Sequence, residues 1–177
     1  MASICVYLGA RAGDGPQWAD AAKHAGRTIA EQGHTLVYGG GRLGLMGILA
    51  DAALAAGGRV VGVIPESMVE REQAHTGIHE NHIVADMHAR KLKLTQLADA
   101  FLVLPGGFGT MDELFEAITW RQLDIHHKRI GLWSVDDYYA DLWAFLRKGR
   151  DLGFMPGATF DAISIDTEFD RLLGQVT

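Results

Sequence analysis

The stretch Leu104-Pro105-Gly106-Gly107-Phe108-Gly109-Thr110-Met111-Asp112-Glu113 decides the fold and the position of the site. It follows the apolar run 100–104 and precedes a segment whose apolar residues recur at helical spacing. This order predicts a buried strand that passes through a glycine turn into the start of a helix. The first N–H groups of a helix lack partners within it, and its dipole is positive at that end. The stretch therefore predicts an anion site, with the Glu113 carboxylate about one turn inside the helix.

Short apolar runs alternate with helical segments along the rest of the chain. The predicted strands are residues 3–8, 35–38, 59–64, 81–84, 100–104, 129–133 and 162–165. The predicted helices are residues 17–32, 45–56, 86–98, 111–123, 137–148 and 167–173, and residues 66–80 form the least regular stretch. Alternation of this kind favours an α/β fold, here a single Rossmann-like domain over residues 1–177 with a doubly wound parallel sheet. The nearly continuous apolar strands agree, because both faces of such a sheet are buried.

Three glycine-bearing loops follow predicted strands, at residues 9–15, 39–44 and 106–109. Ligands of parallel sheets bind at the carboxyl ends of the strands, so these loops should gather at one edge. Gly39-Gly40-Gly41-Arg42-Leu43-Gly44 contains G-x-G-x-x-G, but no acidic residue ends the following strand, and the Walker lysine is missing. Dinucleotide binding and Walker-type ATPase activity are thus disfavoured. Either Gly39, Gly40 and Gly41 form a phosphate loop or they serve only tight turns.

Glu113 has two interpretations. Thr110 and Glu113 have the spacing of a capping box, in which Glu113 would only satisfy the amide of an N-cap threonine. The predicted core stripe of this helix consists of Met111, Leu114, Phe115, Ile118 and Gln122. Glu113 lies off that stripe, toward the glycine loop, which suits a role in chemistry.

The segment Met87-His88-Ala89-Arg90-Lys91 opens the predicted helix 86–98. Two cations at a helix start face the positive end of the dipole, which is unfavourable. Arg90 also falls in line with Met87, Leu94 and Leu97, on the side that should turn inward. A buried arginine needs a carboxylate or phosphate partner, whereas an ordinary solvated basic pair is the alternative.

Composition narrows the function classes. The chain has 177 residues, is 48% hydrophobic and 21% charged, and carries a formal net charge of -6. This negative balance disfavours binding to a nucleic acid polymer but allows a small anionic ligand. The single cysteine, Cys5, lies in an apolar run and favours a buried thiol in a reducing cytoplasm. No secretory signal or membrane-spanning segment is evident.

Neither a metal nor a pyridoxal site is expected. His75, His79, His82 and His88 are close in sequence, but their spacing fits no common zinc pattern. Lys128 follows two histidines in a polar turn, which disfavours a Schiff-base role. The aromatic residues of the C-terminal part fit a core or a subunit contact, and the amphipathic segment 137–150 suits a dimer face.

The motifs together resemble the LOG family of cytokinin riboside 5′-monophosphate phosphoribohydrolases, which often carry the label lysine decarboxylase. Residues 105–113 match the family motif P-G-G-x-G-T-x-x-E, and residues 87–91 match M-x-x-R-K. Tyr38-Gly39-Gly40-Gly41, followed by Gly44-Leu45-Met46-Gly47, resembles a third signature. The similarity extends from the first predicted strand to about Ile165.

The resemblance implies a Rossmann-like homodimer with its active site near the subunit interface. It implies hydrolysis of the N-glycosidic bond of AMP or an N6-modified cytokinin riboside 5′-monophosphate, which releases base and ribose 5-phosphate without metal or cofactor. Arg90 and Glu113 are the implied catalytic pair, with Arg90 orienting Glu113. The implied substrate contacts are Glu72, Lys91, Gly107, Phe108, Gly109, Thr110, Met111, Asp112 and Thr119.

One departure and one rival accompany the resemblance. The family often has Gly-Ser-Ser after the first strand, whereas this chain has Gly9-Ala10-Arg11, which removes two hydroxyls and adds a cation. The rival is a non-catalytic carrier, because the chain also resembles molybdenum cofactor carriers, which hold a phosphorylated pterin. A carrier needs the anion site but not Arg90 with Glu113, so the presence of both favours the enzyme.

Overall fold

The computed structural model describes residues 1–177 and contains one seven-stranded sheet. The strands are β1 (Ser3–Tyr7), β2 (Thr35–Tyr38), β3 (Val60–Pro65), β4 (Glu80–Val84), β5 (Ala100–Val103), β6 (Ile130–Trp133) and β7 (Ile163–Asp166). They pair in the order β4-β3-β2-β1-β5-β6-β7, and every pair is parallel. The prediction of an α/β, doubly wound parallel sheet is confirmed.

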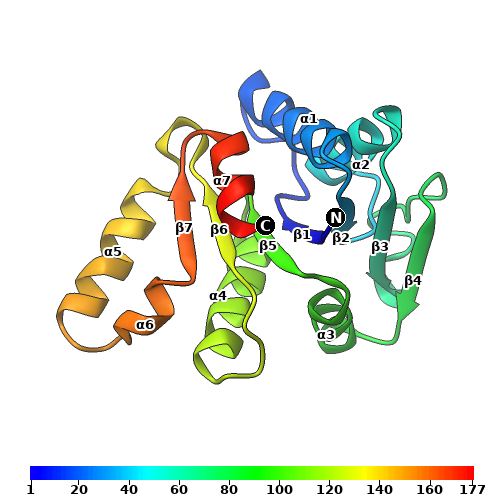
Figure 1. Cartoon of the computed structure of the whole chain (residues 1–177). Coiled ribbons are helices and arrows are strands. Elements are labelled where there is room, and N and C mark those ends of the chain that lie inside the picture. The colour runs from blue at the N-terminus through cyan, green and yellow to red at the C-terminus, as the bar shows by residue number, and fades with distance from the viewer.

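Helices cover both faces of the sheet. They are α1 (Pro16–Glu31), α2 (Gly44–Ala55), α3 (Met87–Leu97), α4 (Phe108–Gln122), α5 (Ala140–Asp151), α6 (Gly157–Phe160) and α7 (Phe169–Val176), with short 3₁₀ turns at Glu66–Met68 and Val135–Asp137. Figure 1 shows α1, α2 and α7 on one face and α3 and α4 on the other, with α5 beside β7. No helix is both long and apolar enough to cross a bilayer.

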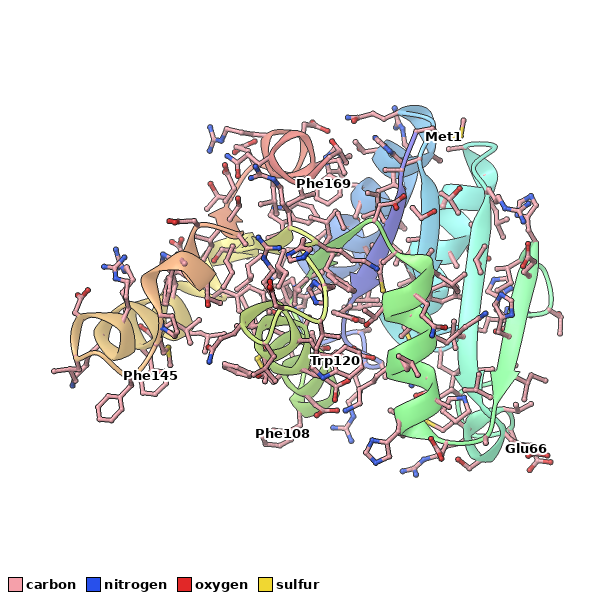
Figure 2. The ribbon with its side chains drawn as sticks, turned by 60° about the horizontal axis from the view of Figure 1, so that its bottom comes forward. Met1, Glu66, Phe108, Trp120, Phe145 and Phe169 are labelled. Carbon is pink, nitrogen blue, oxygen red and sulfur yellow. The ribbon has the colours of Figure 1, made fainter.

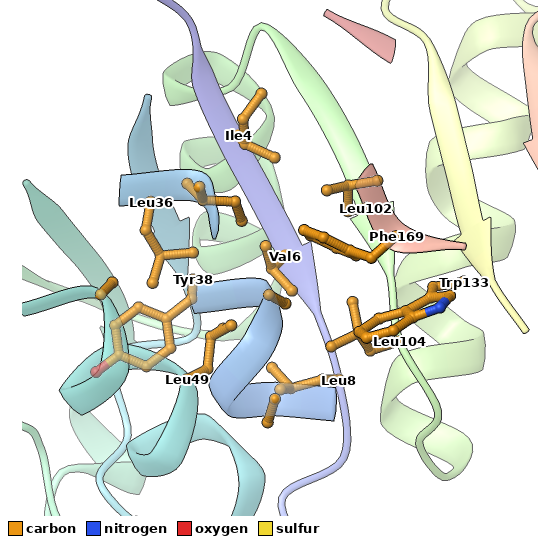
Figure 3. Packing of buried hydrophobic residues seen from close by; sticks show 14 of the residues in the cluster. Ile4, Val6, Leu8, Leu36, Tyr38, Leu49, Leu102, Leu104, Trp133 and Phe169 are labelled. Atoms are coloured by element: carbon orange, nitrogen blue, oxygen red, sulfur yellow. The ribbon is translucent and has the colours of Figure 1, made fainter. Parts of the chain in front are cut away.

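Alternate side chains of each central strand enter one of two cores. Ile4 and Val6 of β1 belong to the core that α1, α2 and α7 cover, whereas Cys5 and Tyr7 point into the core that α3 and α4 cover. Figure 3 shows the first core, in which Tyr38, Leu49 and Phe169 pack with β1. Because both faces of β1 are buried, its run is apolar throughout, as the sequence predicted.

The direction of the chain reverses between β1 and β5. From β1 the chain builds outward through β2, β3 and β4, and then returns to place β5 against the other side of β1. This is the topological switch point, where the loops after the two central strands separate and leave a crevice. The loops after β1 and β5 are the two glycine loops 9–15 and 106–109.

The predicted strand and helix boundaries lie within a few residues of the observed ones, with two exceptions. The short helix α6 was not predicted. Helix α4 begins at Phe108 rather than at Met111, because Gly107 adopts an extended conformation as N-cap and its carbonyl accepts the Met111 amide at 3.1 Å. Thr110 therefore lies inside the helix, and the capping-box interpretation of Glu113 is wrong.

Candidate active site

A cavity of about 890 Å³ opens at the switch point, on the carboxyl edge of the sheet. The loops after β1, β2 and β5 and the starts of α2 and α4 line it, together with Met68, Glu72 and residues of α3. Its charged lining residues are Arg11, Asp14, Glu72, Arg90 and Glu113. The predicted gathering of glycine loops at one edge is thus confirmed, although only Gly39 of the middle loop reaches the cavity.

The start of α4 gives the cavity an array of free amide donors. None of the backbone N–H groups from Gly106 to Thr110 donates a hydrogen bond to another group of the chain. The first amide of this segment with a backbone acceptor is that of Met111. Consecutive unpaired amides at the positive end of a helix dipole form a binding site for an anion such as phosphate.

Close contacts between the two central loops fix this array. The amide of Gly9 donates to the carbonyl of Pro105 at 3.1 Å. A Cβ atom on Gly106 would collide with the Thr110 hydroxyl and the Gly9 amide, whereas one on Gly107 would meet nothing in the chain. The hydroxyl of Tyr138 donates to the Gly106 carbonyl at 2.6 Å. The glycine loop is therefore held from two sides while its amides remain free.

Arg90 is buried, as its place on the inward side of α3 predicted, and is 5% exposed. Its Nε donates to the carbonyl of Val63 at 3.0 Å, and its Nη2 donates to the carbonyl of Gly39 at 2.6 Å. Nη2 also lies 3.3 Å from Oε2 of Glu72. The partner that a buried guanidinium requires is therefore a carboxylate together with two strand-end carbonyls. The alternative of a solvated basic pair is wrong.

Glu72 reaches Arg90 from the segment between Glu66 and β4, which the sequence showed only as irregular. This segment is tied to the loop after β2: the Arg42 amide donates to the Glu72 carbonyl at 3.1 Å, and the His75 amide donates to the Gly40 carbonyl at 2.9 Å. His75 is buried, and its Nε2 lies 3.0 Å from Asp51 of α2. These bonds hold Glu72 over the cavity.

Glu113 faces the same cavity from the first turns of α4. Burial raises the pKa of its carboxyl from 4.5 to about 7, while Arg90 opposes this shift and Asp112 and Glu72 add to it. No hydrogen bond or ion pair joins Glu113 to Arg90, whose polar contacts are with Glu72 and the carbonyls of Val63 and Gly39. The two groups act on each other across the cavity.

Comparison with known proteins places this arrangement in a family. The family model described as "Possible lysine decarboxylase" matches residues 46–176. A cytokinin riboside 5′-monophosphate phosphoribohydrolase of Rhodococcoides fascians is 42% identical over 175 residues, which cover 98% of this chain and 88% of the relative. The LOG7 enzyme of the same description from Arabidopsis thaliana is 47% identical over 152 residues, which cover 86% of this chain and 70% of the relative. This chain belongs to the LOG family.

Solved structures with the same fold include molybdenum cofactor carrier and binding proteins. The molybdenum cofactor carrier protein of Chlamydomonas reinhardtii superimposes with a TM-score of 0.71 and 19% identity, over 99% of this chain and 95% of that one. The molybdenum cofactor binding protein of Rippkaea orientalis gives a TM-score of 0.72 and 20% identity, over 99% and 94%. At such identity the likeness concerns the fold alone.

The cavity of this LOG-family protein contains only part of the residue set that the family resemblance implies. It brings together Glu72, Arg90, Glu113 and the loop residues Gly107, Phe108, Gly109 and Thr110. Outside its lining lie Gly40, Gly41, Lys91, Met111, Asp112 and Thr119. Thr119 is exposed on α4, and Lys91 is buried against α4 rather than turned to the cavity.

Several residues line the cavity although the sequence did not predict them there. Trp18, Met68 and Tyr138 line the cavity, and the rings of Trp18 and Tyr138 meet edge to face with centroids 5.8 Å apart. Trp18 follows a glycine loop, which could have drawn attention to it. Met68 and Tyr138 reach the cavity through long-range packing that no local pattern signals.

The clustered histidines do not converge. His75 faces Asp51, the Nδ1 of His79 accepts the Val60 amide, and His82 lies beside Glu80. The structure contains no group of three or more His, Cys, Asp or Glu side chains arranged to hold a metal ion.

Proposed function

We propose that this protein hydrolyses the N-glycosidic bond of a nucleoside 5′-monophosphate and releases the free base and ribose 5-phosphate. The observation that carries the proposal is the row of free amides from Gly106 to Thr110 in the same cavity as Glu113 and Arg90. The activity by which relatives at 42% and 47% identity are named supports it. AMP and N6-modified adenine nucleotides are the proposed substrate class, and the reaction uses no metal or redox cofactor.

The free amides bind the 5′-phosphate and so fix the sugar relative to Glu113. Arg11 of the loop after β1 lines the same cavity without an ion-pair partner and adds positive charge there. Cleavage of the bond between C1′ and the base nitrogen builds positive charge on the ribose, as in glycoside hydrolysis. The Glu113 carboxylate stabilises that charge and accepts a proton from the attacking water, while the departing base takes up a proton from solvent.

Arg90 acts as a fixed positive charge in this scheme. A guanidinium does not give up its proton in proteins, so Arg90 stabilises the departing base or a phosphate oxygen without protonating it. Glu72 and the carbonyls of Val63 and Gly39 hold the guanidinium in place, so it does not have to reorient during the reaction. Such preorganisation makes a charge effective in the transition state.

The test is release of free base from purified protein. AMP and isopentenyladenosine 5′-monophosphate should be cleaved, and the corresponding nucleosides should react far more slowly because the amides lack an anion to bind. Glu113→Gln and Arg90→Ala should each lower kcat/KM by about 100-fold or more while the protein stays folded. Glu31→Gln is the matched control, because Glu31 ends α1 at the opposite edge of the sheet. Binding of phosphorylated ligands without base release would favour the carrier interpretation instead.

We also propose that the protein is a homodimer with the active site near the subunit contact. Along α4 and its C-cap, five exposed residues recur at helical spacing: Phe108, Asp112, Phe115, Thr119 and Leu123. Phe108 is 95% exposed and projects outward from the start of α4 at the rim of the cavity (Figure 2). Three of the five, Phe108, Phe115 and Leu123, are large apolar side chains, which suits a self-complementary contact between two copies.

A further inference from the structure

Helices α3 and α4 each place one charged residue in the cavity and its sequence neighbour outside it. We call Arg90 with Glu113 the inner pair and Lys91 with Asp112 the outer pair. Arg90 and Glu113 line the cavity, whereas their sequence neighbours Lys91 and Asp112 do not. The Lys91 ammonium lies 2.8 Å from Oε2 of Glu116, 3.1 Å from Oδ2 of Asp112 and 3.4 Å from Oδ1 of Asp112. The outer pair therefore forms an ionic cluster alongside the cavity.

Carboxylate oxygens of two residues surround the ammonium group of Lys91. An ammonium group has three donors, and the three carboxylate oxygens lie within its reach. The residue is only 8% exposed. Burial works against its charge, but Glu116 and Asp112 raise the pKa of Lys91 above its usual value. Lys91 is thus a fixed cation whose donors are already occupied by the protein.

This cluster is also the only polar connection between the two helices. No other hydrogen bond or ion pair joins a residue of α3 to a residue of α4. Arg90 and Glu113 make no direct contact, so no bond between these two side chains sets their separation. Figure 2 shows the two helices on the same face of the sheet, with α3 in front.

We propose that Lys91 is a positioning residue, which ties α3 to α4 through Asp112 and Glu116 and thereby sets the distance between Arg90 and Glu113 without contacting the substrate. The inference rests on the proposed function, because it assigns a role in that reaction to a residue outside the cavity. Adjacent residues on one helix move together, so a tie at Lys91 and Asp112 constrains the inner pair as well. Misplacement of reacting groups by about 1 Å lowers rates by about 100-fold.

The tie also influences the charge of Glu113. The charged groups that influence the pKa of Glu113 are Arg90 and Lys91 of α3, Asp112 of α4 and Glu72 of the segment before β4. The two cations lower its pKa and the two carboxylates raise it. Cys5 and Tyr7 of β1 keep their protons, because burial raises the pKa of both, and they add no charge.

The test compares pH profiles of Lys91→Met, Lys91→Arg and Asp112→Asn with AMP as substrate. Lys91→Met removes a cation and exposes two unpaired carboxylates, so the acid limb of kcat/KM should move to higher pH. Its kcat on the alkaline plateau should fall by about 10- to 100-fold, with KM changed by less than about threefold. Lys91→Arg should restore most of the rate. Asp112→Asn should move the acid limb to lower pH. Lys93→Met is the matched control, because Lys93 lies on α3 without an ion pair.

A pure substrate contact predicts a different result. In that case Lys91→Met would raise KM for AMP strongly and leave the acid limb in place, which would overturn the proposal. Circular dichroism of Lys91→Met establishes that it is folded. If it is not folded, Glu116→Gln, which keeps the pair with Asp112, must show the loss of kcat in a weaker form.

A readout without turnover separates this inference from the proposed function. Carboxyl ¹³C NMR titration of Glu113 in the wild type and in Lys91→Met should show an upward pKa shift in the variant, whether or not AMP is cleaved. An unchanged Glu113 titration overturns the role of Lys91. Failure of the wild type to cleave any nucleoside monophosphate overturns the proposed function alone.

Discussion

Burial disfavours the ionised form of the Glu113 carboxyl group, so the stability of the folded protein depends on pH. Its pKa is about 7 in the folded protein and 4.5 as an ordinary carboxyl, so the folded state binds the proton more tightly. The stabilisation from this proton is complete below pH 4.5 and disappears as the pH rises through 7. The wild type should therefore lose about 1–3 kcal/mol from this one group between pH 5 and pH 8.

Glu113→Gln should be more stable than the wild type at pH 8, by about 1–3 kcal/mol, because a neutral amide replaces a buried charge. At pH 5 the difference should nearly vanish. Urea denaturation at the two pH values measures it, with Glu31→Gln as the control for loss of a surface carboxylate. A destabilised variant at both pH values would show that the Glu113 side chain has a structural role after all.

The sequence predicted the identities of Arg90 and Glu113 and the burial of Arg90, because a cation at the start of a helix on its apolar side requires a partner. It did not predict that this partner is Glu72 with two carbonyls. Glu72 comes from a segment without regular structure, and its position depends on contacts with Gly40, Arg42 and Asp51, which are distant in the chain. Roles that arise from such contacts leave no local pattern.

The start of α4 contains two adjacent glycines with different roles: the fold requires one of them, and the cavity borders the other. Gly106 cannot accept a side chain, because a Cβ atom there would collide with the Gly9 amide and the Thr110 hydroxyl. Gly107 has a φ of -93° and open space where a Cβ would lie. Gly107 is therefore free of internal constraint, and the open space beside it belongs to the cavity.

Gly107→Ala should fold with a melting temperature close to that of the wild type, yet raise KM for AMP about tenfold or more, because its methyl group lies where the phosphate approaches the amides. Gly106→Ala should instead lower the melting temperature, as overpacking costs about 1–3 kcal/mol. Thermal denaturation and initial rates for both variants distinguish the two glycines. An unchanged KM in Gly107→Ala would place the phosphate elsewhere in the cavity.

The errors in predicting α4 have one physical origin. The predicted stripe correctly included the buried Leu114, but it also included Phe115 and Gln122, which are exposed, and it left out Ala117, which is buried. Helical spacing identifies neighbours on a helix without showing whether the sheet or another surface covers them. Likewise, the Thr110 and Glu113 spacing fits a cap, but an extended Gly107 lets the helix begin two residues before Thr110.

For the molecule as a whole, the exposed residues of α4 would connect the proposed dimer contact to the site. Phe115 is near the middle of the helix, while Phe108 lies at the cavity rim and Thr119 one turn beyond Phe115. A two-fold axis near Phe115 would pair two copies of α4 in antiparallel fashion. The later turns of one α4 would then approach the cavity rim of the other copy, which gives Thr119 a route to a substrate that it cannot reach within its own chain.

Phe115→Asp should therefore convert a dimer to a monomer, with a dimer dissociation constant raised at least about 30-fold, because it puts a charge at the centre of an apolar contact. Sedimentation velocity over a concentration series measures this change, and circular dichroism checks the fold. Phe145→Asp on α5 is the matched control, since Phe145 is 63% exposed on the other apolar helix surface. If Phe145→Asp dissociates the dimer and Phe115→Asp does not, α5 forms the contact.

Thr119→Val distinguishes the two contacts by kinetics. A contact through α4 brings Thr119 to the cavity of the partner subunit, so the variant should have a higher KM for AMP. A contact through α5 leaves Thr119 away from any cavity, so KM for AMP should stay unchanged.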